Sequence, residues 1–505
     1  MALDQDLCYR AVVTRDRRFD GRFFTAVLTT GVYCRPVCPA RCPARKNVRF
    51  YACAAAAETD GFRPCLRCRP ETAPGSAAWL GTSATVTRAL RLIEDGVLDR
   101  DGVEGLAERL GVTDRWLRQL FEEQLGASPL AVARTRRIHF ARRLLDESTL
   151  PIEEVAAASG FGSARRLRDA IQATFHRSPA ALRGRRSRVR VAAMENDHAT
   201  SSGPALRLAA RAPFDAAPIL RFLAARAIPG IEKIEDGRYL RSAMLDGEPG
   251  IVEVTPVAGA PALDVRWSGS SSRGLLELAT RVARVFDLRA DVLTIGAELT
   301  RDPRLAHCWP TTGLRVPGAW DPFEIAVRVL LGQQVSVAAA RTLAARLAER
   351  HGASIPRPTV PGLVRRFPDA TRLADANLDG LGITGARITA IRGFARAVAE
   401  GRVDLGTARD LDDTVATLTQ LPGVGPWTAQ VIAMRALGEP DAFPAGDLGV
   451  RQALAHDGRM PSEREAIALA ERWRPWRSYA VLALWNGPVA PATTPTPKRS
   501  RRIRT

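Results

Sequence analysis

The sequence carries two close cysteine pairs, in Gly31-Val-Tyr-Cys34-Arg-Pro-Val-Cys38 and, after a gap of 26 residues, in Gly61-Phe-Arg-Pro-Cys65-Leu-Arg-Cys68. Each pair can supply two corners of a tetrahedral Zn²⁺ site, in which the Zn–S bonds are about 2.3 Å long. The spacing therefore predicts one all-thiolate zinc site, with Cys34, Cys38, Cys65 and Cys68 as its ligands. On spacing alone, a purely structural zinc site is the simplest interpretation.

The residues around these cysteines resemble the N-terminal methyl-phosphotriester repair domain of the bacterial Ada proteins, over about residues 4–75. The similarity is carried by three stretches, Thr29–Pro36, Arg45–Tyr51 and Gly61–Cys65. It implies that Cys34 is both a zinc ligand and the nucleophile that irreversibly accepts a methyl group from a DNA phosphotriester. Four arginines near the thiolates are expected to contact DNA, namely Arg35, Arg45, Arg63 and Arg67.

The other four cysteines lie outside this pattern. Cys42 is close to the first pair, where the family has no cysteine, so it is a rival ligand. Cys8, Cys53 and Cys308 are most simply small apolar residues.

The composition fits a polyanionic partner. The 505 residues include 73 Lys and Arg against 54 Asp and Glu, a formal net charge of +19. Such a balance is typical of proteins that bind nucleic acid, although an arginine-rich genome produces it too. The length predicts three or four domains, each with its own core. No signal peptide or long apolar run is present, so we expect a cytoplasmic, nucleoid-associated protein with no membrane partner.

A first helix-turn-helix pattern lies in Val103–Phe121. Gly111 is expected to end one helix, and Thr113 to cap the next. Four side chains of the second helix are predicted to face inward: Trp116, Leu117, Leu120 and Phe121. Arg115 and Arg118 are predicted to face outward, where such side chains reach base edges in a major groove.

A second pattern lies in Ile152–Arg168 and continues to Phe175, and the basic segment Arg134–Arg143 joins the two. One such pattern alone can be a plain helical hairpin. The pair resembles the AraC-type DNA-binding domain, which Ada proteins carry in this position. The resemblance implies recognition helices at about 114–125 and 163–175, with Arg165 and Arg166 contacting promoter DNA. RNA polymerase would be a further partner of such an activator.

After Pro204, apolar and polar residues alternate in three stretches, Tyr239–Met244, Gly250–Pro256 and Ala262–Trp267. They predict antiparallel strands. Helical segments resume at about residue 273 and continue to about 487.

Within this helical part, Leu421-Pro-Gly423-Val-Gly425-Pro-Trp427 predicts a helix-hairpin-helix turn. Its two glycines would let backbone N–H groups approach a phosphate oxygen. Asp447 follows 22 residues after Gly425, about where base-excision glycosylases of this superfamily place their catalytic aspartate. Without the hairpin, a helix N-cap would be the simpler role for Asp447.

Residues 204–490 as a whole resemble AlkA, the 3-methyladenine DNA glycosylase of broad substrate range. The resemblance implies base excision by Asp447 and a base pocket containing Trp427 and Trp485, although tryptophans at helical spacing are more often core residues. Two positions depart from the family. Val431 replaces a pocket tyrosine, and Gln334 replaces the leucine that wedges into the duplex. Both departures bear on substrate range and base flipping.

The sequence therefore predicts a multidomain, mainly α protein that acts on alkylated double-stranded DNA. Its expected parts are a small α/β zinc domain (4–75), an all-α double helix-turn-helix domain (84–185), a linker (186–203), an α+β antiparallel-sheet domain (204–287), an all-α helix-hairpin-helix glycosylase domain (288–490) and a basic tail (491–505).

The predicted activities are suicidal methyl transfer to Cys34, methylation-switched transcriptional activation, and monofunctional base excision. A bifunctional glycosylase/lyase would need a lysine in the hairpin helix, and no four-cysteine iron–sulfur cluster is expected. The Pro-Cys-His-Arg word of an O6-methylguanine methyltransferase is absent from the sequence, so that activity is not expected. The competing interpretation is a transcription factor whose zinc and glycosylase folds are catalytically silent.

Overall fold

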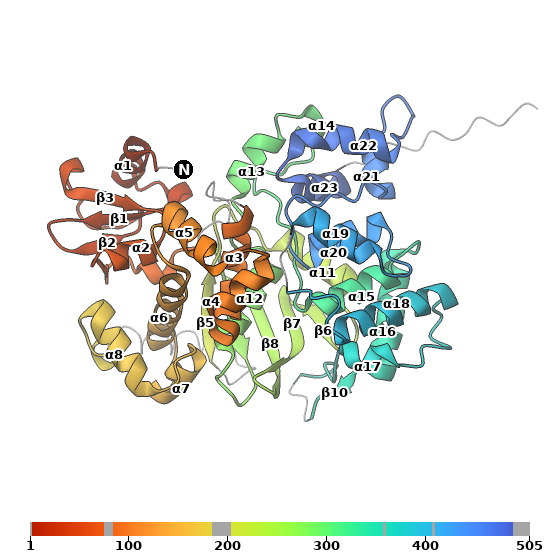
Figure 1. Cartoon of the computed structure of the whole chain (residues 1–505), viewed down its shortest axis with the longest axis horizontal. Coiled ribbons are helices and arrows are strands. Elements are labelled where there is room, and N and C mark those ends of the chain that lie inside the picture. Colours follow the sequence, from red (N-terminus) through yellow and green to blue (C-terminus); the bar gives the residue numbers. More distant parts are fainter. Residues whose placement is uncertain (1–2, 75–83, 184–203, 357–359, 407–409, 488–505) are drawn as a thin grey trace, which may run out of the picture.

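The computed structural model describes residues 3–74, 84–183, 204–356, 360–406 and 410–487. A small sheet domain and a helical domain lie on one side of a central five-stranded sheet, and the C-terminal helices lie on the other side (Figure 1). The predicted linker 186–203 and basic tail 491–505 lie outside the described residues.

The N-terminal domain is built on a four-stranded sheet with the order β3-β1-β2-β4. Its elements are α1 (Gln5–Thr14), η1 (Arg17–Phe19), β1 (Phe24–Val27), β2 (Val32–Cys34), η2 (Arg45–Asn47), β3 (Val48–Tyr51), α2 (Ala54–Thr59), β4 (Arg63–Pro64) and η3 (Pro70–Thr72). Strands β2 and β4 pair in parallel, with Val32 opposite Arg63 and Tyr33 opposite Pro64. This pairing brings Cys34, at the end of β2, beside Cys65, the residue after β4.

The next domain is all-α. It consists of α3 (Ala84–Glu94), α4 (Val97–Leu110), α5 (Asp114–Leu125), α6 (Pro129–Glu147), α7 (Ile152–Ala158), α8 (Ala164–Phe175) and α9 (Pro179–Leu182). Gly111 ends α4 in the left-handed conformation, and the Thr113 side chain accepts a hydrogen bond from the Trp116 N–H at 3.3 Å. Ser163 caps α8 in the same way. Helices are therefore present at both positions predicted for recognition helices.

The prediction that Trp116 of α5 faces the core is wrong. Trp116 is 43% exposed, whereas Leu117 and Phe121 are fully buried. The buried stripe of α5 runs through Leu117, Phe121 and Leu125. Because successive helical residues point about 100° apart, Trp116 lies to the side of this stripe.

The predicted strands are confirmed. The central sheet contains β5 (Ala205–Ala209), β6 (Glu232–Glu235), β7 (Arg238–Leu245), β8 (Glu248–Pro256) and β9 (Ala262–Trp267), in the order β5-β9-β8-β7-β6. Every neighbouring pair is antiparallel. Strand β5 therefore lies at an edge of the sheet.

Helices and two short strands make up the rest of this half. They are α11 (Ala217–Arg226), α12 (Leu275–Val285), α13 (Val292–Leu299), α14 (Pro303–Ala306), α15 (Pro322–Leu331), α16 (Val337–His351), β10 (Ala353–Ser354), β11 (Arg365–Arg366), α17 (Ala370–Ala374), α18 (Gly385–Ala399), α19 (Leu411–Thr419), α20 (Pro426–Arg435), α21 (Leu448–Ala453), α22 (Glu463–Ala470), η4 (Glu471–Trp473) and α23 (Arg477–Asn486).

Helix α20 lies between two hydrophobic clusters of this helical part. Ala429 and Ile432 belong to one cluster, while Ala433 and Met434 belong to the other. With both sides of α20 buried, its N-terminus is held firmly at the junction of the two clusters. The predicted hairpin turn precedes this end.

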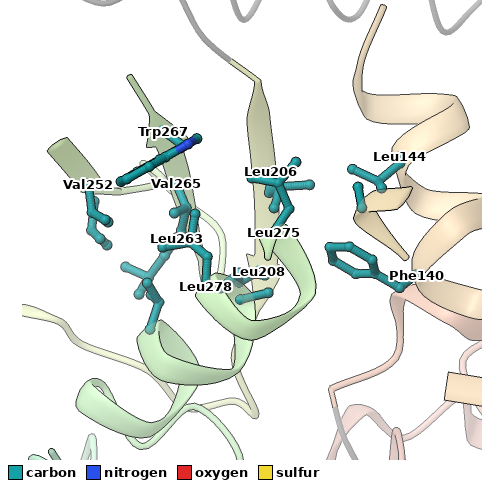
Figure 2. Close-up of a cluster of buried hydrophobic side chains, with 14 of the residues drawn as sticks. Phe140, Leu144, Leu206, Leu208, Val252, Leu263, Val265, Trp267, Leu275 and Leu278 are labelled. Carbon is teal, nitrogen blue, oxygen red and sulfur yellow. The ribbon is translucent and has the colours of Figure 1, made fainter. Parts of the chain in front are cut away.

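The helical domain and the central sheet do not have separate cores, contrary to the expectation of one core per domain. A single cluster of buried residues contains side chains of α6, α7 and α8 together with side chains of the sheet and α12. Figure 2 shows Phe140 and Leu144 of α6 facing Leu206 and Leu208 of β5. The two halves of the chain are therefore joined by apolar contacts.

None of the helices in the described residues is long and apolar enough to cross a membrane.

Candidate zinc centre and glycosylase site

The four predicted ligands converge. The Sγ atoms of Cys34, Cys38, Cys65 and Cys68 all lie within 4.8 Å of one another. Tetrahedral Zn–S bonds of about 2.3 Å place sulfur atoms about 3.8 Å apart, so the group fits a single Zn²⁺. Cys34 and Cys68 are buried, and the other two are half-buried. The rival Cys42 is exposed and lies outside this group.

Arg35, which was predicted to contact DNA, turns toward partners inside the domain. Its Nε donates to Oδ1 of Asp20 at 2.8 Å, and its Nη1 donates to Thr72 Oγ1 at 2.8 Å and to the Cys68 carbonyl at 3.3 Å. Its side chain is only 17% exposed. Because Asp20 supplies a buried counter-charge, the guanidinium turns inward and braces the metal loop. The guanidinium that was predicted to contact DNA is therefore already paired inside the domain.

The other three predicted arginines remain accessible to different degrees. Arg67 is exposed and Arg63 is half-buried. The Arg45 guanidinium lies over the rings of Tyr9 and Phe50, at 5.7 and 5.6 Å from their centroids. These stacked contacts hold Arg45 in place while its side chain stays 40% exposed.

A half-buried carboxylate joins the residue before Cys34 to the helix-turn-helix domain. Glu58 of α2 accepts hydrogen bonds from the hydroxyls of Tyr33 (2.8 Å) and Thr135 (2.6 Å), and it lies 3.2 Å from His139 Nε2. Burial raises the pKa of Glu58, but His139 and the two hydroxyls outweigh burial and hold that pKa below its usual value. Thr135 and His139 both belong to α6, so the charged carboxylate ties this helix to β2.

A second connection follows Cys68 directly. Arg69 forms ion pairs with Asp146 of α6 (2.6 Å) and with Glu71 (3.1 Å). The residues next to two zinc ligands, Tyr33 and Arg69, are therefore both linked to one helix. Sequence reasoning missed Glu58 and His139, because they are 81 positions apart and no local pattern relates them.

The hairpin before α20 has the predicted form, but its two glycines differ. Gly423 has a φ of +75°, and a Cβ there would lie 2.5 Å from the Ala390 Cβ. Both the backbone conformation and the close approach of α18 therefore require glycine. Gly425 has an ordinary φ and open space around it. It leaves the N-terminus of α20 exposed, where backbone N–H groups can meet a phosphate.

Asp447 is both a helix N-cap and the centre of a cluster with the two predicted pocket tryptophans. Its Oδ1 accepts from the Val450 N–H at 3.0 Å, as the cap of α21, and from Trp485 Nε1 at 2.9 Å. Its Oδ2 accepts from Trp427 Nε1 at 3.0 Å. Asp447 therefore does cap α21, as the simpler interpretation expected. Its contacts with the two indoles are additional to that role.

Gln334 protrudes from the turn between α15 and α16. It is exposed and has a φ of +54°, a left-handed conformation that is uncommon for a residue with a side chain. The adjacent Gln333 donates to the Gly423 carbonyl at 2.8 Å and to Thr428 Oγ1 at 2.9 Å. This turn and the hairpin are therefore held together. Val431 is buried within α20.

Four described families match consecutive parts of the chain. They are "Metal binding domain of Ada" at residues 7–71, "Helix-turn-helix domain" at 106–185, "AlkA N-terminal domain" at 205–321, and "HhH-GPD superfamily base excision DNA repair protein" at 327–478. The four cysteines described above are therefore the zinc site of an Ada-type domain.

Three relatives cover different parts of the chain. "Probable bifunctional transcriptional activator/DNA repair enzyme AlkA" of Mycobacterium tuberculosis is 44% identical over 489 residues, 96% of both chains. "DNA-3-methyladenine glycosylase 2" of Escherichia coli is 35% identical over 276 residues, 54% of this chain and 94% of the relative. "Bifunctional transcriptional activator/DNA repair enzyme Ada" of Escherichia coli is 40% identical over 142 residues, 28% of this chain and 38% of the relative. The chain thus belongs to the family of bifunctional transcriptional activators and DNA repair enzymes in which an Ada-type zinc domain and a helix-turn-helix domain are fused to an AlkA-type DNA glycosylase.

Proposed function

We propose that the glycosylase half excises alkylated bases of the 3-methyladenine type by hydrolysis, with Asp447 as the catalytic carboxylate. A base alkylated on a ring nitrogen carries positive charge and already leaves readily. The enzyme must therefore mainly stabilise the positive charge that develops on the sugar and orient a water molecule, and a carboxylate can do both. The lesion must also leave the base stack, which the exposed Gln334 would assist.

The arrangement around Asp447 carries this proposal. A carboxylate offers about four lone-pair positions. Oδ1 accepts two N–H groups, from Val450 and Trp485, whereas Oδ2 accepts one hydrogen bond from the described part of the chain, from the Trp427 indole. Oδ2 therefore keeps a free position for the sugar or the water. An N-cap role alone explains the Val450 contact but not the two indoles.

We also propose that the N-terminal domain repairs DNA methyl-phosphotriesters at Cys34. The Cys34 sulfur would attack the methyl carbon, forming an S–C bond while the C–O bond to the phosphotriester breaks. The electron pair of that bond stays on the phosphate oxygen, so the products are a phosphodiester anion and a thioether at Cys34. Bound Zn²⁺ would keep the four thiols deprotonated. The four-cysteine cluster and the match to the Ada metal-binding family support this role.

The recognition helices supply the regulatory part of the proposal. Arg115 and Arg118 on α5, and Arg165 and Arg166 on α8, are all exposed. They would read promoter DNA in successive major grooves. As an activator, the chain would act on RNA polymerase at those promoters.

One assay on alkylated duplex DNA tests both enzymatic roles, if released bases and protein-bound methyl groups are counted separately. Asp447→Asn should lower base release by about 10²-fold or more, because it removes the negative charge. Asparagine is a good N-cap, so α21 should persist and methyl transfer should be unaffected. Cys34→Ser should abolish methyl transfer and preserve base release. If Asp447→Asn releases bases at the wild-type rate, Asp447 is not the catalytic carboxylate.

A further inference from the structure

Helix α6 covers the exposed edge of the central sheet. Among the strands of the described residues, β5 pairs only with β9, so the backbone groups on its other side have no neighbouring strand there. Two of these groups, both of Arg207, bind side chains of α6. The Arg207 N–H donates to Glu147 Oε2 at 3.2 Å, and the Arg207 carbonyl accepts from Arg143 Nη2. The two side chains therefore replace the hydrogen bonds of a missing strand.

Glu147 and Arg143, bound to the backbone of Arg207, form what we call the clamp between α6 and β5. Its side chains are largely buried. The Glu147 side chain is 2% exposed and Arg143 is 15% exposed, and their charged groups lie 3.6 Å apart. Phe140 and Leu144 pack against Leu206 on the same side of α6 (Figure 2). Removing a charged pair from water costs free energy, and this cost is offset only while the pair keeps its hydrogen-bond partners. The contact between α6 and β5 thus combines apolar packing with a specific pair of polar side chains.

Both helix-turn-helix units depend on the position of α6. Ala133, near its N-terminus, packs in one cluster with Leu117 and Phe121 of α5. Leu145, near its C-terminus, packs in another cluster with Leu167 of α8. One rigid helix therefore carries both recognition helices. The contacts that fix the position of α6 therefore also fix the spacing between α5 and α8, the two helices that would enter DNA grooves.

We propose that the sheet of the glycosylase half has a second function, as the scaffold that holds α6 and both recognition helices in their promoter-binding arrangement. This inference rests on the promoter binding proposed above. A recognition unit that is already ordered loses less conformational entropy on binding, so releasing α6 from β5 should weaken promoter affinity. Base excision should not change, because Asp447 and its partners lie in the helical part beyond the sheet.

The test uses the full chain with Arg143→Ala and Glu147→Ala combined. Hydrogen exchange at the Arg207 amide reports whether the clamp is open. Promoter affinity is measured on a duplex from the region directly upstream of the chain's own coding sequence, and base release on methylated duplex DNA. We expect faster exchange at Arg207 and a loss of promoter affinity of about tenfold. Base release should stay within about twofold of wild type.

Two further variants separate a scaffold role from misfolding. Glu147→Gln alone keeps an oxygen that can accept the Arg207 N–H, so it should keep most of the promoter affinity that the double variant loses. Glu298→Ala with Arg301→Ala removes an exposed Arg–Glu pair at the C-terminal end of α13, a helix that Figure 1 shows apart from α6. This control should bind promoter DNA like the wild type.

Two results would overturn the scaffold role. One is a protected Arg207 amide in the double variant, because the clamp would then not be what holds β5. The other is fast exchange with unchanged promoter affinity, because the recognition helices would then not need the sheet. If the wild type itself fails to bind the duplex, the proposed promoter binding fails, and the scaffold role fails with it.

Discussion

Trp427 Nε1 donates a hydrogen bond to Oδ2 of Asp447 at 3.0 Å, across 20 positions of the chain. The first turn of the hairpin helix thus orients the carboxylate proposed to act on the sugar. From the sequence, Trp427 was expected to line the base pocket. The structure adds a polar role, since Trp485 makes the matching contact to Oδ1 at 2.9 Å.

Trp427→Phe should separate these two roles, because phenylalanine keeps an aromatic face but has no N–H. A hydrogen bond to a charged group contributes about 1.5–3 kcal/mol, so we expect base release to fall by about tenfold or more. Base release by Trp427→Ala should be slower still, because this variant also loses the aromatic ring. The measurement is the single-turnover rate of base release. Equal rates for wild type and Trp427→Phe would show that the indole N–H does not orient Asp447.

The glycosylase should make no strand break of its own. Lyase members of the superfamily form a Schiff base with a lysine, and the resemblance places Trp427 at that position. Helix α20 contains no lysine. Borohydride treatment during the reaction should therefore trap no covalent protein–DNA adduct. A trapped adduct would establish a bifunctional enzyme and contradict the hydrolytic mechanism.

Methylation of Cys34 should raise promoter affinity. It converts a thiolate to a neutral thioether, so one negative charge near the DNA is lost. Arg45 and Arg67 then act on phosphate with less opposition, whereas Arg35 stays paired with Asp20. The gain should shrink as salt is added, because added ions screen the interaction.

Operator binding before and after exposure to methyl-phosphotriester DNA measures this switch, with Cys34→Ser as the control. Equal affinities of the two wild-type forms at low salt would exclude a charge switch. Such a result would leave methyl acceptance by Cys34 untouched, because methyl transfer is measured separately.

Asp287 should make the stability of the glycosylase half depend on pH. It accepts hydrogen bonds from the Tyr479 hydroxyl (2.9 Å) and the Val316 N–H (3.0 Å), both on Oδ2. Burial raises the pKa of Asp287 from 3.8 to about 6, although Arg315 opposes the shift. Because the folded pKa is the higher one, its stabilising contribution is complete below about pH 3.8 and is lost as the pH rises through about 6.

Asp287→Asn cannot ionise, and its Oδ1 can accept both hydrogen bonds. The free energy of unfolding of this variant, relative to wild type, should therefore increase between about pH 4 and pH 8, by at most about 3 kcal/mol. Urea denaturation followed by tryptophan fluorescence at several pH values measures the difference. A difference that does not change with pH would show that folding does not shift the pKa of Asp287.

Short-range patterns in the sequence were sufficient for much of this protein. The close cysteine pairs, the Gly111–Thr113 turn and the hairpin at Gly423 each depend on residues within a few positions of one another. Such features follow from local geometry, namely metal-ligand spacing, helix capping and left-handed glycine. Asp447 was predicted from the resemblance to the glycosylase superfamily, whose catalytic aspartate follows the hairpin at about this distance.

Only the tertiary structure decided which way several side chains point and how the halves meet. Arg35 turns inward because Asp20 lies beside it, and Trp116 turns outward because the core lies about one residue further round α5. The docking of α6 on β5 joins Glu147 to Arg207, 60 positions apart, through a backbone N–H that every non-proline residue has. Such contacts leave no periodic or local signal, because they depend on which surfaces remain uncovered once each domain has folded.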